Sequence, residues 1–208
     1  YAYIENNIIN NTGYGGAYFS GISCISEAYE DKSTPRGGYC IYNNSVCNTG
    51  RAGFYMSSAN YKTQTDEEYK KNMREGDRGQ YLPCDIAYNY FYNTNLIARD
   101  SGGVYIHGNN SGNDIKFTSL HNNVVCNVQG NDNSKDYFQP FRTESYYYND
   151  AWTAGINTYN NIGLATNEKQ ARSSNETEVY GSEWKDMSVS SGNVDCGIIP
   201  DGIKGLSC

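Results

Sequence analysis

The chain has 208 residues, a formal net charge of -7, 21 Tyr, 22 Gly and 19% charged residues. Low charge with abundant Tyr is unlike a disordered chain, and an acidic balance with neither a basic patch nor an RNA-binding motif argues against nucleic acid or an anionic membrane as partner. The sequence has no apolar run of about 18 residues, so we expect no membrane insertion.

An asparagine-rich segment recurs along the chain. Residues 4–13 (IENNIINNTG), 41–50 (IYNNSVCNTG), 87–94 (AYNYFYNT) and 120–128 (LHNNVVCNV) fit one frame. One column of this frame is apolar: Ile9, Val46, Phe91 and Val125. The two flanking columns are asparagine: Asn7, Asn44, Asn89 and Asn123, then Asn11, Asn48, Asn93 and Asn127. Such alternation predicts strands with one buried face, with the asparagines stacked at turns.

A second segment follows each copy, at residues 16–20, 53–57, 103–107 and, more weakly, 155–159. Aligning these segments predicts an inward column of Ala17, Phe54, Val104 and Ile156. It also predicts an outward row of Tyr18, Tyr55, Tyr105 and Asn157 and a parallel row of Ser20, Ser57, His107 and Tyr159. Because the copies recur every 34 to 45 residues, we expect a solenoid of stacked coils.

These "NNxΦxN…GΦY" coils resemble the right-handed parallel β-helix of the pectate-lyase-like superfamily. The resemblance implies an all-β fold, with coils over residues 1–166, further N-terminal coils missing, and a C-terminal capping segment over residues 167–208. Loop insertions are expected at residues 24–39 and 130–152, and one short helix, with Thr65 as its N-cap, within residues 63–79. The superfamily includes hydrolases, lyases, epimerases and non-catalytic adhesins, so the resemblance leaves activity open.

Seven cysteines occur, an odd count. Cys47 and Cys126 share an outward column with Asn10 and Tyr92, and Tyr92 separates the two thiols by one coil. Their Cα atoms should then lie about 10 Å apart, whereas a disulfide needs less than about 7 Å. We therefore expect no bridge between them and no metal site. Any bridge from either should go to a loop thiol such as Cys24, Cys40 or Cys84. Cys196 and Cys208 could bridge each other across the tail.

The outward rows are candidates for sugar binding. Tyr18, Tyr55 and Tyr105 would form a ladder of exposed rings on which sugars stack, or a ladder that only stabilises the sheet. His107 falls beside Tyr105 and could act as acid, base or hydrogen-bond partner. His121 precedes an asparagine turn, where a structural role is expected.

The resemblance is closest over "DSGGVY" (residues 100–105) and "YYNDAWTAGINTYNN" (residues 147–161), and by this likeness Asp100 and Asp150 are the candidate catalytic carboxylates. Two carboxyl groups suit glycosidic cleavage, in which one protonates the leaving oxygen and the other attacks or activates water. The alternative is that these residues cap turns.

Trp152 would flank the carboxylates, and Arg99 and Arg142 would bind substrate. No cofactor or metal is expected, because the clustered acidic calcium ligands of pectate lyases are not evident.

We therefore expect a secreted or cell-surface protein that acts on a polysaccharide or oligosaccharide. A glycoside hydrolase with a cleft along the second-strand sheet is the leading hypothesis. A non-catalytic glycan-binding or adhesion module is the alternative, and a polysaccharide lyase comes third.

Overall fold

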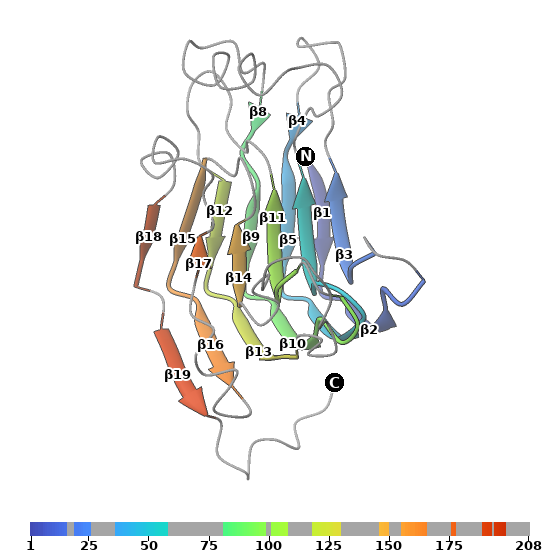
Figure 1. Ribbon diagram of the computed structural model, residues 1–208. Helices are drawn as coiled ribbons and strands as arrows, with labels where there is room; N and C mark the ends of the chain where they lie inside the picture. The colour runs from blue at the N-terminus through green and yellow to red at the C-terminus, as the bar shows by residue number, and fades with distance from the viewer. Residues whose placement is uncertain are drawn as a thin grey trace, which may run out of the picture.

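The computed structural model describes residues 1–15, 19–25, 36–57, 81–98, 101–107, 118–129, 146–149, 155–165, 176–177, 189–192 and 194–198. All regular structure in these ranges is β-strand, arranged in stacked sheets (Figure 1). None of the described residues forms a helix that could cross a membrane. The short helix expected within residues 63–79 lies outside the described residues.

Three sheets carry nearly all the strands. Sheet A contains β1 (Ala2–Glu5), β5 (Tyr39–Tyr42), β9 (Asp85–Ala87), β12 (Thr118–His121), β15 (Ile156–Tyr159) and β18 (Val189–Ser191). Sheet B contains β2 (Ile8–Thr12), β6 (Ser45–Thr49), β10 (Tyr90–Thr94), β13 (Val124–Val128), β16 (Ile162–Ala165) and β19 (Val194–Ile198). Sheet C contains β3 (Ile22–Ile25), β7 (Phe54–Ser57), β11 (Val104–His107), β14 (Tyr147–Asn149) and β17 (Glu176–Thr177). A small sheet D pairs β4 (Arg36–Gly37) with β8 (Tyr81–Leu82).

The chain visits sheets A, B and C in turn, and each passage is called a repeat below. Repeat 1 holds β1, β2 and β3, repeat 2 holds β5, β6 and β7, and repeat 3 holds β9, β10 and β11. Repeat 4 holds β12, β13 and β14, repeat 5 holds β15, β16 and β17, and β18 and β19 begin repeat 6. Every strand pairs in parallel with the equivalent strand of the next repeat.

The predicted interior column of sheet B is confirmed. Phe91 of β10 lies opposite both Val46 of β6 and Val125 of β13, and all three side chains are completely buried. Ile9 continues the column into β2. Alternation therefore predicts the inward column of sheet B correctly.

The predicted alignment of the second segments is wrong at both ends. Ile22 of β3, not Ala17, lies opposite Phe54, and the fourth member of the column is Tyr147 of β14, not Ile156. Residues 156–159 form β15, which pairs with β12 in sheet A. The error has a simple cause, because β15 of sheet A directly follows a glycine and begins with a buried residue, as β3, β7 and β11 of sheet C also do.

Strand pairing also continues past residue 166, where we expected the coils to end. β18 pairs with β15, and β19 pairs with β16 as far as Ile198. The last residues, 199–208, to which capping was also assigned, lie outside the described part of the chain.

Two asparagine ladders run along the corners between the sheets. In the inner ladder, at the corner between sheets A and B, Asn89 donates from its backbone N and from Nδ2 to Oδ1 of Asn123, at 2.9 and 3.0 Å. The same Nδ2 also donates to the carbonyl oxygens of Ile41 and Ala87. The arrangement extends through Asn7, Asn44, Asn89, Asn123 and Asn161. These bonds satisfy buried amides and fix the register of neighbouring repeats.

The second ladder lies at the penultimate residue of β6, β10 and β13 in sheet B. Asn48, Asn93 and Asn127 stack there, as predicted, and all three adopt the left-handed backbone, with φ between 51° and 55°. Asparagine tolerates this region better than most residues because its short polar side chain can bond locally.

Candidate functional site

The tyrosine ladder predicted on sheet C exists, but it is not exposed. Tyr105 stacks on Tyr55 with ring centroids 5.3 Å apart, and on Tyr148, rather than a residue of the 155–159 segment, at 5.2 Å. Tyr105 and Tyr148 are buried, and only Tyr55 is partly exposed. The guanidinium of buried Arg51 lies over the rings of Tyr55 and Tyr105, at 4.9 and 4.4 Å. This ladder therefore packs the protein instead of presenting rings to a sugar, and our expectation of exposed rings is wrong.

His107 lies opposite Ser57, as the alignment predicts, yet both side chains are buried. The residue opposite Tyr55 in repeat 1 is Ser23, not Tyr18. The other predicted site residues fall outside the described part of the chain: Tyr18, Arg99, Asp100, Arg142, Asp150 and Trp152. The pairing of Asp100 with Asp150 therefore stays a prediction.

A different cluster lies on the outer face of sheet A. Inward positions there hold Ile41, Ile86 and Leu120, all completely buried. The outward position just before each asparagine turn forms a continuous row of Glu5, Tyr42, Ala87, His121 and Tyr159. Large polar or aromatic side chains thus line this row except at Ala87.

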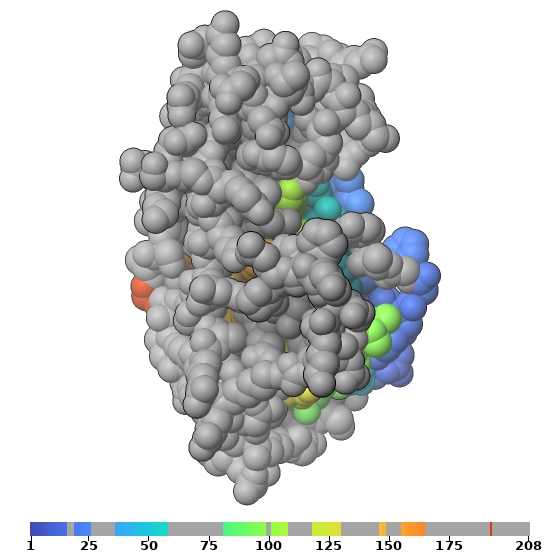
Figure 2. All heavy atoms as spheres, viewed as in Figure 1, coloured from blue at the N-terminus to red at the C-terminus, as the bar shows by residue number. Residues whose placement is uncertain are grey.

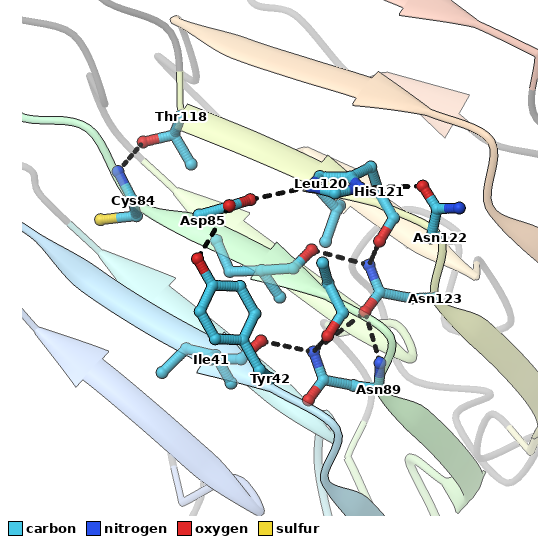
Figure 3. A network of polar contacts seen from close by, with 12 residues as sticks. Ile41, Tyr42, Cys84, Asp85, Asn89, Thr118, Leu120, His121, Asn122 and Asn123 are labelled. Carbon is cyan, nitrogen blue, oxygen red and sulfur yellow. Dashed lines mark hydrogen bonds and ion pairs between the residues drawn. The ribbon is translucent and has the colours of Figure 1, made fainter. Parts of the chain in front are cut away.

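Asp85 connects Tyr42 and His121, which lie on the two strands that flank β9 and are separated in the row by the small side chain of Ala87. It stands two residues before Ala87 on β9 and so shares its face. Tyr42 Oη donates to Asp85 Oδ2 at 2.8 Å, and His121 Nε2 lies 2.9 Å from Asp85 Oδ1 (Figure 3). Since an ionised carboxylate only accepts, the imidazole donates. The other ring nitrogen, Nδ1, lies 2.8 Å from Asn122 Oδ1.

The carboxylate of Asp85 is held firmly but remains accessible. Its side chain is 40% exposed, whereas His121 is 15% exposed. Burial, followed by the hydrogen bond to Asp85, raises the pKa of Tyr42, so this phenol stays protonated and continues to donate. Asp85 can therefore accept further hydrogen bonds from a ligand.

Two more rings complete the surface. Tyr159 stacks face to face on His121, with centroids 4.7 Å apart and planes 4° from parallel. Tyr88 meets His121 edge-on at 5.9 Å and is 61% exposed. We call Tyr42, Asp85, Tyr88, His121 and Tyr159 the sheet A site; they come from four successive repeats.

Tyr88 occupies a strained backbone position. The equivalent residues of the other repeats are Asn6, Asn43, Asn122 and Asn160, and all five have φ between 52° and 59°. Left-handed backbone is uncommon for a bulky residue and costs about 1–2 kcal/mol. Tyr88 therefore stands where the other repeats carry asparagine, the residue best suited to this turn. Residues with strained backbone conformations cluster at functional sites.

The cysteines do not form a reactive centre. Burial raises the pKa of the Cys24 thiol to about 12 and that of Cys126 to about 11. Burial likewise raises the pKa of Cys84, whose Sγ lies 3.4 Å from Tyr81 Oη. Thiols with raised pKa values are poor nucleophiles and poor metal ligands. Among the described residues, no group of His, Cys, Asp and Glu could hold a metal ion.

The disulfide predictions are confirmed in part. The column Asn10, Cys47, Tyr92 and Cys126 has the expected register, although both cysteines are buried. Cys126 is free and Cys47 is disulfide-bonded, so the two do not bridge each other, as predicted. Cys24, Cys40 and Cys84 are free, so none of the three loop thiols named as examples is the partner of Cys47.

Sequence reasoning missed the sheet A site. It treated His121 as structural and gave no role to Tyr42, Asp85 or Tyr88. One signal was present, because Tyr88 breaks an asparagine column in the repeat frame.

Comparison with known proteins adds no relative. No protein-family model matches the chain, and no curated protein or solved structure matches it significantly.

Proposed function

We propose that the chain is a right-handed parallel β-helix of the pectate-lyase-like type that binds a glycan at the sheet A site. The three stacks of parallel strands, visited in turn, support a solenoid. Right-handedness rests on the general rule that crossovers between parallel strands of one sheet have this hand.

Glycan binding rests on the composition of the sheet A site. Aromatic rings offer flat apolar surfaces to the C–H faces of a sugar, while a half-exposed carboxylate accepts hydrogen bonds from its hydroxyl groups. Tyr88 supplies an exposed ring and Asp85 the acceptor. The observation that carries the proposal is the left-handed, exposed Tyr88 in place of an asparagine.

Binding is favoured over hydrolysis because the sheet A site contains a single carboxylate, that of Asp85. Cleavage of a glycosidic bond needs two carboxyl groups, about 5 to 9.5 Å apart. Hydrolysis by Asp100 and Asp150 is kept as a second proposal that rests on their sequence likeness alone. An extracellular or cell-surface location is proposed on the same basis.

The test is a panel of plant, algal and microbial glycans, measured for binding and for turnover. We expect saturable binding of at least one glycan, lost when Tyr159 is replaced by alanine. Release of reducing ends, abolished in Asp100→Asn and Asp150→Asn, would instead identify a hydrolase. Absorbance of unsaturated uronates near about 235 nm would identify a lyase. Binding that is unchanged in Tyr159→Ala would place the site elsewhere and contradict the proposal.

A further inference from the structure

We infer that Asp85 makes the sheet A site selective for sugars that carry no carboxylate. This inference rests on the proposed function, because it concerns the ligand of the same site. It also runs against the expectation that the resemblance to pectate lyases would suggest, namely an acidic substrate.

The first argument is the position of the charge. Asp85 contacts both Tyr42 and His121 in the middle of the sheet A site, and its side chain is 40% exposed. A sugar lying across Tyr88 and Tyr159 would have to pass close to it, since both rings contact His121.

The second argument is the absence of a compensating cation. Within the part of the chain that the structure describes, the only Lys and Arg residues are Arg36 and Arg51. Arg51 is buried against Tyr55 and Tyr105 on sheet C, and Arg36 belongs to β4 of sheet D. His121 is already engaged with Asp85. A uronate would therefore meet a carboxylate without an arginine or lysine from these residues to neutralise it.

The expected loss of affinity follows from the distance between the two carboxylates. A ligand carboxylate about 5 Å from that of Asp85, in a setting intermediate between bulk water and a protein surface, would weaken binding about tenfold at low salt. Neutral hydroxyl groups would suffer no such loss and could donate to the free lone pairs of Asp85.

The experiment compares glycans that differ only in charge. The probes are the β-1,4-linked hexaoses of glucose, galactose and mannose, each also tested after selective oxidation of its C6 hydroxyl groups to carboxylates. For a hexaose that binds, we expect the oxidised form to bind about tenfold more weakly at low salt. The difference should shrink as the salt concentration rises, because the carboxylates are exposed to solvent.

The variant Asp85→Asn keeps the shape of the side chain and should bring the two affinities within about twofold of each other. Glu5→Gln is the matched control, since it changes the net charge equally from the same outward row but from the far side of Tyr42. Equal affinity of wild type for both forms, or discrimination unchanged in Asp85→Asn, would overturn the selectivity while leaving glycan binding intact. Failure of all three neutral hexaoses to bind would contradict this inference, whereas the proposed function fails only if no glycan of the panel binds.

Discussion

Replacing Tyr88 with asparagine should weaken glycan binding while leaving the free energy of unfolding nearly unchanged. Asparagine is what the other repeats carry at this turn, and Asn43 Nδ2 donates to Asn6 Oδ1 there at 2.7 Å. The substitution should relieve about 1 kcal/mol of left-handed strain. It removes an edge-on contact with His121 that is worth about 0.5–1.5 kcal/mol. Little burial is lost, because the side chain is 61% exposed. We therefore expect the free energy of unfolding to change by less than about 1 kcal/mol, in either direction.

Binding should behave differently. If Tyr88 supplies the platform for a sugar, its loss removes a central aromatic contact and should weaken binding about tenfold or more. The assay is titration calorimetry with a glycan that binds, alongside urea unfolding followed by circular dichroism. Tyr3→Asn is the control, because Tyr3 is similarly exposed at 64% but lies in repeat 1, away from His121. A variant that binds normally and loses more than about 2 kcal/mol of stability would show that Tyr88 serves packing, and would refute the reasoning.

Four further outcomes are expected. The thiols of Cys24 and Cys126, whose pKa values are raised to about 12 and about 11, should resist a thiol reagent at pH 8 until the protein unfolds, and reaction in the native state would contradict their burial. Because these folded-state pKa values exceed the ordinary value of 9.0, the stability they contribute is complete below about pH 9 and should fall as the pH rises toward 12, as measured by urea unfolding. Asn89→Ala removes hydrogen bonds on both sides of its repeat and should cost at least about 3 kcal/mol, again by urea unfolding; a loss below about 1 kcal/mol would mean that the ladder is dispensable. Peptide mapping without reductant should recover Cys47 in a disulfide, while Cys24, Cys40, Cys84 and Cys126 are recovered as free thiols; a cross-link from Cys47 to any of these four would contradict the structure.

The interior of sheet B and both asparagine columns could be predicted from sequence because each has a strict local requirement. The position of Phe91 must be apolar to be buried, and the positions of Asn93 and Asn127 must tolerate a left-handed backbone. Such requirements leave an apolar residue, or an asparagine, at the equivalent position of repeats 1 to 4.

The rest failed for two physical reasons. Alternation reports which face of a strand is buried but not which sheet the strand joins, so Ile156 was assigned to sheet C instead of sheet A. Exposure of an outer face also depends on what covers it, and nothing in the spacing of Tyr105 predicts that its ring is buried. The sheet A site was missed because its central contact, from Asp85 to His121, joins residues 36 positions apart that occupy different columns of the frame.

The inner asparagine ladder gives the stack a direction. The amide nitrogens of Asn7, Asn44, Asn89 and Asn123 each donate to the amide oxygen of the asparagine in the following repeat, ending at Asn161 among the described residues. The amide dipoles therefore add head to tail, and the end at repeat 1 presents the oxygen of Asn7 as an acceptor. Any unit grafted there must offer donors at that corner, whereas a second acceptor end would meet oxygen against oxygen. A repeat added by design should therefore run in the same direction as the parent strands, so that its asparagine donates to the oxygen of Asn7.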